Sequence, residues 1–523
     1  MEPIAALDPH VCQQARLSRD VRFDGLFFTG VKTTGIFCRP ICSAVPPKEE
    51  NVTYYLSAGA AIAEGFRPCL RCRPETAPQS AAWLGIEAVA GKILRYIDQG
   101  YLIEHSVPEL AESIGISERY LRQLCQRYAG ASPSQIELAR KSLFAKQLVF
   151  DSSLSITDIA FASGYNSVRR FNEHWLQQFG KAPSEMRSKR RAFQQCNPGC
   201  NQDGSWINLR IPVIEGFDAD SIFSFLATRI IAGSEAIITH KAKKNSERVT
   251  LEYQRVLQLD VQLILLAVSY DEKNACLLVS FKKIENGSIG QKSIGNEVNA
   301  LKLLPRIFQL VKQVFDVETN AQVILSHLKN SDEFGKQLAT RERDGLQDIR
   351  LPAAFDPFEA AMRAIVGQQV SVKAACTLLT RLSERCGTTV ADNEWQLIRT
   401  LPNAQSIVDN DLSGLGLTGA RINSLKSMAL LRISEPEVFS LGYDNEVRRK
   451  KFLAIKGIGP WTVSYLEMRA FSNPDAFPAG DLGVRIALEK QDVRPTEKQV
   501  LELSKPWAPW RAYATVLLWQ RLI

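Results

Sequence analysis

Two close pairs of cysteines constrain the fold of the first 72 residues more than any other feature of the chain. Cys38 and Cys42 form a C-x3-C pair. Cys69 and Cys72 form a C-x2-C pair, and 26 residues separate it from the first. This spacing predicts a tetrahedral Zn²⁺ site, because that ion is well matched by four thiolates. The pattern alone also allows a purely structural zinc that lets a small module fold.

The length and patterning predict several folded units. A chain of 523 residues exceeds one compact core, and 45% hydrophobic with 23% charged residues is an ordinary globular composition. Strand-like runs with Gly/Pro loops come first, then helical periodicity, then α/β alternation up to about residue 324, then helices again. We therefore expect a multidomain fold: a small α+β zinc module (1–78), an all-α unit (83–191), an α+β unit (205–350) and an all-α unit (351–523).

Charge and cysteine usage favour a DNA partner and a reducing compartment. The net charge is +8, and residues 115–191 alone carry 13 Lys/Arg against 6 Asp/Glu. The chain has no apolar run of roughly 18 residues and no signal-peptide pattern, so we predict a cytoplasmic, nucleoid-associated protein without a membrane partner. Cys196 and Cys200, in the segment CNPGC, are interpreted as ordinary thiols, with a stray metal site or a disulfide as alternatives.

The residues around the cysteine quartet resemble the amino-terminal module of the Ada family over residues 10–78. The similar segments are GVKTTGIFCRPIC, ENVTYYLSAGAAIAEGFRPCLRC and RPETAP. The resemblance implies one zinc, structural and activating, and a Cys38 that irreversibly takes a methyl group from an alkylated DNA phosphate. Metal binding would keep this sulfur a thiolate, and hence a nucleophile, at neutral pH. Thr34, Arg39 and Arg67 are candidate phosphate contacts, with solvated loop residues as the alternative.

Two helix-turn-helix patterns follow in tandem, at residues 107–130 and 156–180. Each has a Gly at its turn and a second helix with polar and basic residues, the arrangement that enters a major groove. Together with the closing APSEMR, they resemble the AraC-type domain of Ada proteins. The resemblance implies DNA contacts at Arg119, Arg122, Asn166, Ser167, Arg169 and Arg170. The alternative is that these side chains are exposed to solvent and contact no base or phosphate.

A glycine hairpin and a later acidic residue indicate a base-excising module. Gly457 and Gly459 lie in KGIGP between two helical patterns, where backbone N–H groups can reach a DNA phosphate. About twenty residues on, FPAGDLGVRIAL places Asp481 near a helix start. These segments resemble helix-hairpin-helix glycosylases, most closely the AlkA family of 3-methyladenine excisers, as do residues 356–375, 412–425 and 507–519; residues 206–324 resemble that family's amino-terminal domain more loosely.

The resemblance to AlkA proteins assigns roles within this module. Asp481 would stabilise the oxocarbenium-like charge that develops on the sugar, and helix capping is the competing interpretation. Trp461, Tyr465 and Trp519 would line the pocket of the flipped base, with core packing as their alternative. Gln368 and Gln369 are candidate DNA contacts, and a monovalent cation at the hairpin is allowed.

Several departures from the families narrow the expected reaction. Trp461 stands where strand-nicking relatives carry a Lys nucleophile, and no cysteine beyond Cys386 could hold an iron-sulfur cluster, so we predict monofunctional hydrolysis. Gln369 replaces a Leu wedge, and Leu482 follows Asp481 where a pocket aromatic can occur. The chain has no P-C-H-R motif, so we do not expect the O6-methylguanine transferase of standard Ada proteins.

These features lead to one favoured function and two alternatives. We expect a monomeric 3-methyladenine DNA glycosylase that binds damaged and promoter DNA, and whose methylation at Cys38 makes it a transcription activator contacting RNA polymerase. A repair enzyme with a purely structural zinc is the first alternative. A DNA-binding regulator with an inactive glycosylase is the second.

Overall fold

The structure is a computed structural model, and it describes residues 9–20, 23–74, 88–98, 100–188, 206–241, 249–259, 262–284, 296–343, 345–390, 395, 397–440, 443 and 445–522. The prediction for Cys196 and Cys200 lies outside these residues. Within the described ranges, no helix combines the length and the apolar character needed to span a lipid bilayer.

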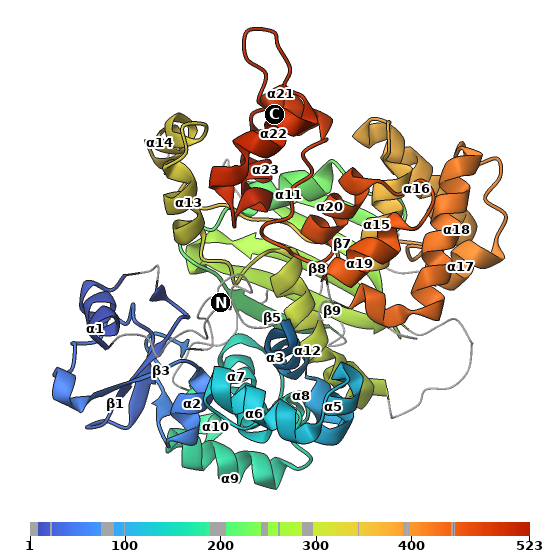
Figure 1. The fold of residues 1–523 in the computed structure, drawn as a ribbon. Helices are drawn as coiled ribbons and strands as arrows, with labels where there is room; N and C mark the ends of the chain where they lie inside the picture. Colours follow the sequence, from blue (N-terminus) through green and yellow to red (C-terminus); the bar gives the residue numbers. More distant parts are fainter. Residues whose placement is uncertain are drawn as a thin grey trace.

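The cysteine module is a small four-stranded sheet with two short helices (Figure 1). Its strand order is β3-β1-β2-β4, and only the β2–β4 pair is parallel. Phe28, Phe37 and Ala61 form a core of modest size, as expected for a module that needs a metal staple. The elements are α1 (Pro9–Ser18), β1 (Phe28–Val31), β2 (Ile36–Cys38), η2 (Glu49–Asn51), β3 (Val52–Tyr55), α2 (Ala58–Ala63) and β4 (Arg67–Pro68).

The next unit is entirely helical and contains both helix-turn-helix patterns where the sequence predicts them. Serine side chains cap the helices on both sides of each turn, for example Ser117 before α6 and Ser167 before α9. Gly115 ends α5 in the left-handed conformation (φ +81°), which gives the first turn its sharp reversal. The helices are α3 (Ala88–Asp98), α4 (Tyr101–Glu104), α5 (Val107–Ile114), α6 (Glu118–Ala129), α7 (Pro133–Asp151), α8 (Ile156–Ala162), α9 (Val168–Phe179) and α10 (Pro183–Ser188).

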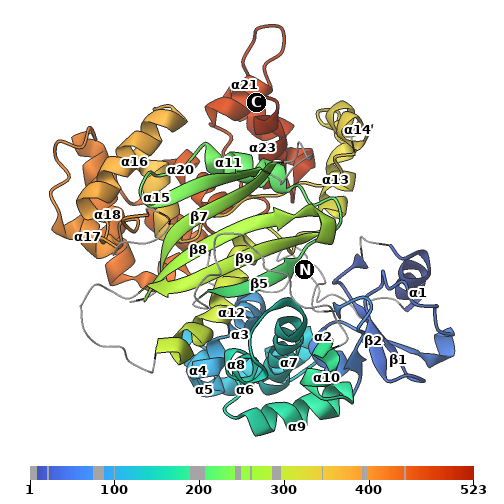
Figure 2. The same cartoon turned by 180° about the vertical axis from the view of Figure 1, so that it is seen from behind.

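A five-stranded antiparallel sheet with the order β5-β9-β8-β7-β6 forms the middle of the molecule (Figure 2). Strands β6 to β9 form an antiparallel meander, and β5, which α11 separates from β6 in the chain, pairs with β9, so this region is the α+β unit that the sequence predicts. The elements are β5 (Ile207–Pro212), α11 (Ala219–Ala227), β6 (Glu235–Lys241), β7 (Val249–Leu259), β8 (Gln262–Asp271), η5 (Glu272–Asn274), β9 (Cys276–Ile284) and α12 (Asn296–Val314).

The carboxy-terminal helices form two hydrophobic cores. One core lies among α15, α18 and α20, and the other joins α13 and α14 to the last helices. The helices are α13 (Ala321–Lys329), α14 (Gly335–Arg343), α15 (Pro357–Val366), α16 (Val372–Cys386), α17 (Ala404–Asp409), α18 (Gly419–Ser434), η6 (Pro436–Phe439), α19 (Asn445–Leu453), α20 (Pro460–Arg469), α21 (Leu482–Ala487), α22 (Glu497–Leu503), η7 (Lys505–Trp507) and α23 (Arg511–Gln520).

Hydrophobic packing crosses the linker between the helix-turn-helix unit and the sheet. Helix α12 lies between the sheet and the reader helices in both views (Figures 1 and 2). Phe144 of α7 packs edge-to-face on Phe308 of α12, with ring centroids 5.4 Å apart. Ser152, just after α7, forms an isolated β-bridge with Leu209 of β5. The reader and the sheet thus share one continuous core.

Candidate functional site

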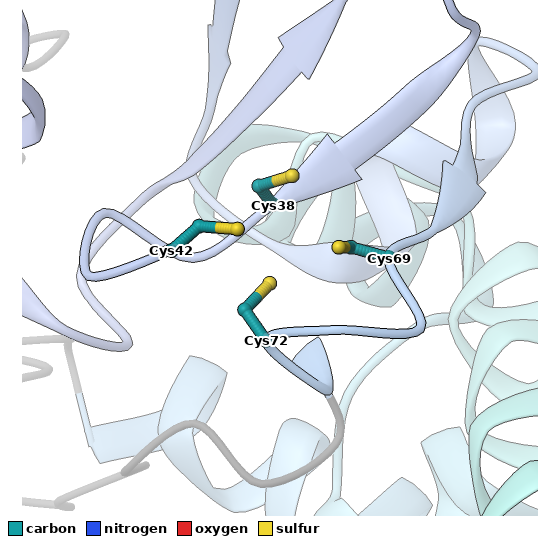
Figure 3. A group of neighbouring side chains, drawn as sticks. All are labelled: Cys38, Cys42, Cys69 and Cys72. Atoms are coloured by element: carbon teal, nitrogen blue, oxygen red, sulfur yellow. The ribbon is translucent and has the colours of Figure 1, made fainter. Parts of the chain in front are cut away.

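The four cysteines converge on one point from two loops (Figure 3). Their sulfur atoms all lie within 4.8 Å of one another. The parallel pairing of Phe37 with Pro68 brings Cys38 and Cys69 side by side, and the peptide N–H of Cys69 donates to the Phe37 carbonyl at 3.0 Å. Four thiolates at Zn–S distances of about 2.3 Å have sulfurs roughly 3.8 Å apart, so the cluster fits tetrahedral zinc.

Hydrogen bonds among these thiols change their acidity. Hydrogen bonding with Cys38 lowers the pKa of the Cys42 thiol to about 7. The same partner lowers the pKa of Cys69 far below its ordinary value. The pKa of Cys38 is raised, chiefly by its hydrogen bond with Cys42, and that of Cys72 is raised as well, so a bound cation is needed to hold all four sulfurs as thiolates.

Two basic residues, Arg39 and Lys146, hydrogen-bond to the cysteine residues of the cluster. The sequence analysis assigns this role to neither. Arg39 is buried, ion-pairs with Asp24, and its backbone N–H donates to the Cys72 sulfur at 3.3 Å. Lys146 of α7 is fully buried and donates from Nζ to the Cys69 carbonyl at 3.2 Å. Arg39 therefore braces the cluster, and a phosphate contact by it stays a prediction.

The other predicted phosphate contacts of the module are accessible. Thr34 and Arg67 are exposed, and the Arg67 guanidinium donates to the Thr34 carbonyl at 3.4 Å. Arg67 also lies close to Gly180, just after α9 of the reader. The two residues thus lie together on a surface that adjoins the second helix-turn-helix.

The predicted reader residues lie at the starts of α6 and α9. Ser167 caps α9 by accepting from the Arg170 N–H at 3.2 Å. Two of the arginines form exposed pairs with acidic residues of their own helix, which a DNA phosphate can replace at small cost. Asn166 and Arg170 border an open cleft of about 420 Å³. The exposed side chains of the predicted set are Arg119, Arg122, Asn166, Arg169 and Arg170.

Asp481 lies between two indole rings. The Trp461 Nε1–H donates to Oδ2 and the Trp519 Nε1–H donates to Oδ1, both at 3.0 Å. The carboxylate also caps α21, where Oδ1 accepts from the Val484 N–H at 3.0 Å. Tyr465 stacks on Trp461 with ring centroids 5.5 Å apart and planes 24° apart. The structure thus brings together the acidic residue and the three predicted pocket aromatics, all half-buried.

The glycine hairpin is tied to a second loop. Gly457 has φ +91°, and a Cβ there would lie 2.3 Å from the Ser424 hydroxyl. Gln368 donates from Nε2 to the Gly457 carbonyl at 3.0 Å, so its side chain braces the hairpin. Gln369 is exposed at the turn before α16 and adopts a left-handed φ of +55°, so its side chain is presented outward. Ser424 lies 33 positions before Gly457, inside the AlkA-like segment 412–425, and the sequence analysis assigns it no role.

The cysteine cluster, the double helix-turn-helix and the carboxylate beside a glycine hairpin together define a fusion of an Ada-type module and an AraC-type reader with an AlkA-type unit. Family models agree: the metal binding domain of Ada matches residues 11–75, a helix-turn-helix domain residues 110–189, and the AlkA N-terminal domain residues 208–356. The recognition of these three families is therefore confirmed.

The chain belongs to the family of AlkA-type bifunctional transcriptional activator/DNA repair enzymes. It is 31% identical over 519 residues to the "Probable bifunctional transcriptional activator/DNA repair enzyme AlkA" of Mycobacterium tuberculosis, covering 98% of this chain and 96% of that protein. It is 33% identical to the Escherichia coli "Bifunctional transcriptional activator/DNA repair enzyme Ada", over 31% of this chain and 45% of that one. The E. coli "DNA-3-methyladenine glycosylase 2" is 28% identical, over 43% and 74% respectively.

Proposed function

We propose that this protein excises alkylated bases of the 3-methyladenine type from DNA by hydrolysis. The observation that carries the proposal is the Asp481 carboxylate, which accepts hydrogen bonds from two indoles beside a third aromatic ring. The names of its relatives, which include DNA repair enzymes and 3-methyladenine glycosylases, support the same reaction.

The residues of the site divide the reaction between them. As the glycosidic bond of a flipped nucleotide breaks, positive charge develops on the sugar, and the fixed Asp481 carboxylate stabilises it. Water then adds to the sugar carbon, its proton passes to solvent, and the products are a free base and an abasic site. The indole bonds hold Asp481 in one orientation, so little reorganisation accompanies the step.

Aromatic rings supply the selectivity for damaged bases. An alkylated purine carries a positive charge, and the electron-rich faces of Trp461 and Tyr465 attract it more than an undamaged base. Gln369, exposed at its turn, would enter the gap in the duplex and replace the lost stacking by hydrogen bonds. A monovalent cation at the hairpin carbonyls is part of this proposal.

The excision assay compares Asp481→Asn with wild type on methylated DNA. We expect base release to fall by about 100-fold or more, because the amide lacks the charge that faces the sugar. Asp475→Asn is the matched control: it removes a nearby carboxylate that pairs with Arg511, and its base release should stay close to wild type. An Asp481→Asn protein that is fully active would overturn the assignment.

We further propose that Cys38 takes a methyl group from a DNA methylphosphotriester. The sulfur forms a bond to the methyl carbon, the methyl–oxygen bond breaks, and an ordinary phosphodiester anion leaves. Bound zinc would keep the Cys38 sulfur nucleophilic. Exposed Thr34 and Arg67 would position the phosphate, while Arg39 and Lys146 hold the backbone of the ligands Cys72 and Cys69.

Methyl transfer would also regulate DNA binding. Zn²⁺ with four thiolates has a net charge of −2, and methylation of one sulfur leaves −1, so repulsion between the module and the DNA backbone falls. The methylated form would bind promoter DNA more tightly through α6 and α9 and, as a monomer, contact RNA polymerase. Footprinting before and after methylation, on the protein's own promoter, tests this regulation.

Transfer itself is tested with DNA that carries radiolabelled methyl groups. We expect Cys38→Ser to lose the protein-bound label and Cys376→Ser, a half-exposed thiol in the helical unit, to keep it. Label that persists in Cys38→Ser would assign the role to another cysteine.

A further inference from the structure

A small cavity lies beside the base-binding aromatics and is lined by four arginines. Its volume is about 40 Å³, and Tyr465, which stacks on Trp461, forms part of its wall. The cavity is therefore in direct contact with the site around Asp481 through one aromatic ring. Its charged lining residues are Arg229, Glu235, Arg255, Glu359, Arg363 and Arg469.

Two of the arginines are neutralised within the protein. Arg255 donates to Glu359 at 2.9 Å, and Arg363 donates to Glu235 at 2.7 Å. Arg363 also reaches Glu359, and Tyr253 donates its hydroxyl to Glu235 at 2.6 Å. Two guanidiniums and two carboxylates thus form a closed, neutral network.

The other two arginines donate only to neutral acceptors: Arg229 to the Phe225 carbonyl and the Thr228 hydroxyl, and Arg469 to the Pro352 carbonyl. Within the described part of the chain, neither Arg229 nor Arg469 forms an ion pair with a carboxylate. Both guanidinium groups lie over the ring of Phe225, at 3.7 and 4.1 Å from its centroid, and both interact with the hydroxyl of Tyr465. Burial lowers the pKa of Arg469 to about 10. The cavity wall therefore carries two positive charges that no carboxylate offsets, and for the buried Arg469 this is costly without an anion.

A buried donor also lacks a partner. The Nε–H of Arg255, a residue only 3% exposed, forms no hydrogen bond. Buried donors are nearly always satisfied in folded proteins, so this N–H indicates a ligand that accepts hydrogen bonds. The available space is small, because one water already needs roughly 10–15 Å³.

We propose that this cavity binds a small monovalent anion of halide size, with chloride as the physiological occupant. Arg229 and Arg469 supply the charge, and the Tyr465 hydroxyl and the Arg255 Nε–H supply further donors. The anion lowers the positive charge next to Tyr465, so the neighbouring site tolerates a cationic base better. This last consequence rests on the proposed function, whereas anion binding itself does not.

The test measures thermal unfolding of the full-length, zinc-loaded protein at constant ionic strength while sodium bromide replaces sodium gluconate. Gluconate is too large for a cavity of about 40 Å³. We expect the melting temperature to rise saturably with bromide, and the same protein to broaden the ³⁵Cl resonance of chloride until bromide displaces it. Equal melting temperatures in the two salts, or no broadening, would show that water alone fills the cavity and overturn the proposal.

Substitutions of the cavity arginines test whether bromide raises the melting temperature by binding in this cavity. Arg229→Gln and Arg469→Gln should each weaken the response to bromide by tenfold or more. Arg449→Gln, whose arginine pairs with Glu467 outside the cavity, should respond like wild type. If Arg469→Gln does not fold, Arg229→Gln still tests the site, because Arg229 is only half-buried. A wild-type rise of melting temperature with bromide in Arg229→Gln would contradict the assignment. These measurements need no DNA, so they can fail while base excision succeeds.

Discussion

At the residue scale, the orientation of Asp481 depends on donors that come from two different helices. Trp461 begins α20 and Trp519 lies in α23, and each indole N–H holds one carboxylate oxygen. The backbone leaves little room around this arrangement, since a Cβ on Gly483 would lie 3.1 Å from Asp481 Oδ1 and 3.2 Å from Trp519. The indoles therefore hold the Asp481 carboxylate in position.

Replacing Trp519 with Phe separates these two roles. The ring stays, but Asp481 Oδ1 loses one donor, and a hydrogen bond to a charged group contributes about 1.5–3 kcal/mol. We expect base release to slow by roughly 10- to 100-fold in single-turnover assays. Trp507→Phe is the matched control, because it removes an indole bond to Ser331 in the core. Equal losses in both variants would mean that the Trp519 effect is only structural.

Site residues that belong to a recognisable sequence motif were predictable from the sequence. Residues that reach the site from a distant part of the chain were not. The four cysteines come together as their spacing predicts, and Asp481 lies beside the three aromatics. By contrast, Lys146 contacts Cys69 across 77 positions of sequence. A single lysine in a helix is normally solvated, so only the tertiary structure reveals its burial.

At the element scale, the hairpin before α20 has two glycines with different physical requirements. Gly457 needs its positive φ and the space next to Ser424 for the turn to form. Gly459 has an ordinary φ of −101°, and a Cβ there would meet nothing within 4 Å. The first glycine shapes the turn, and the second leaves the surface of the hairpin unobstructed, as the proposed contact with a DNA backbone requires.

Alanine at each position should therefore produce distinct effects. We expect Gly457→Ala to destabilise the protein by about 1–3 kcal/mol and to weaken DNA binding, because the left-handed backbone is strained with a side chain. Gly459→Ala should leave stability unchanged while weakening DNA binding. Thermal unfolding and binding to abasic-site DNA measure the two quantities. A destabilised Gly459→Ala protein with normal binding would contradict these roles.

Secondary structure was predicted better than strand arrangement. The runs at residues 249–259 and 276–284 are strands β7 and β9 with the expected limits. Both strands pair antiparallel with β8, an arrangement that the strand-like runs do not specify. A strand buried on both faces has the same pattern in either type of sheet, so periodicity alone could not decide.

At the scale of the whole molecule, the reader and the repair unit form a single body. The shared core includes side chains of α7, α8 and α9 together with the sheet and α12. The cysteine module is attached to the same reader: Ser57 donates to the Ala129 carbonyl at 2.6 Å, and Arg73 pairs with Asp151. Loss of packing at α12 should therefore destabilise both the reader and the repair unit.

The variant Phe308→Ala tests this coupling. Phe308 is 2% exposed and packs on Phe144 of the reader, so its removal should cost about 3–5 kcal/mol. We expect DNA binding by the reader and base release to be lost at the same lowered temperature. Leu121→Ala is the control, since this fully buried residue belongs to a cluster of reader helices that includes no residue of the sheet or of α12. Unchanged heat inactivation of base release in Phe308→Ala would show that the halves unfold independently.

A half-buried carboxyl at this junction should make the stability of the whole molecule depend on pH. Asp98, the last residue of α3, faces Glu318 and Lys312 from the repair unit and Glu137 and Arg140 from α7. Each of these cations already has a carboxylate partner: Lys312 binds Glu318 at 2.5 Å, and Arg140 binds Glu137 at 2.7 Å. The cations of this group, with Lys141 also on Glu137 at 3.7 Å, are thus all paired with acids other than Asp98.

Burial, reinforced by Glu318, raises the pKa of Asp98 to about 7 from its ordinary 3.8. The folded protein keeps this proton where the unfolded chain has released it, so the stability that it contributes is lost as the pH rises from about 4 through 7. Asp98→Asn cannot ionise, and we expect it to match wild type near pH 4 and to melt at a higher temperature at pH 8. Thermal unfolding at the two pH values measures the difference. A wild-type pH dependence in Asp98→Asn would mean that the junction tolerates the ionised carboxyl, and that another group sets the stability of the joined halves.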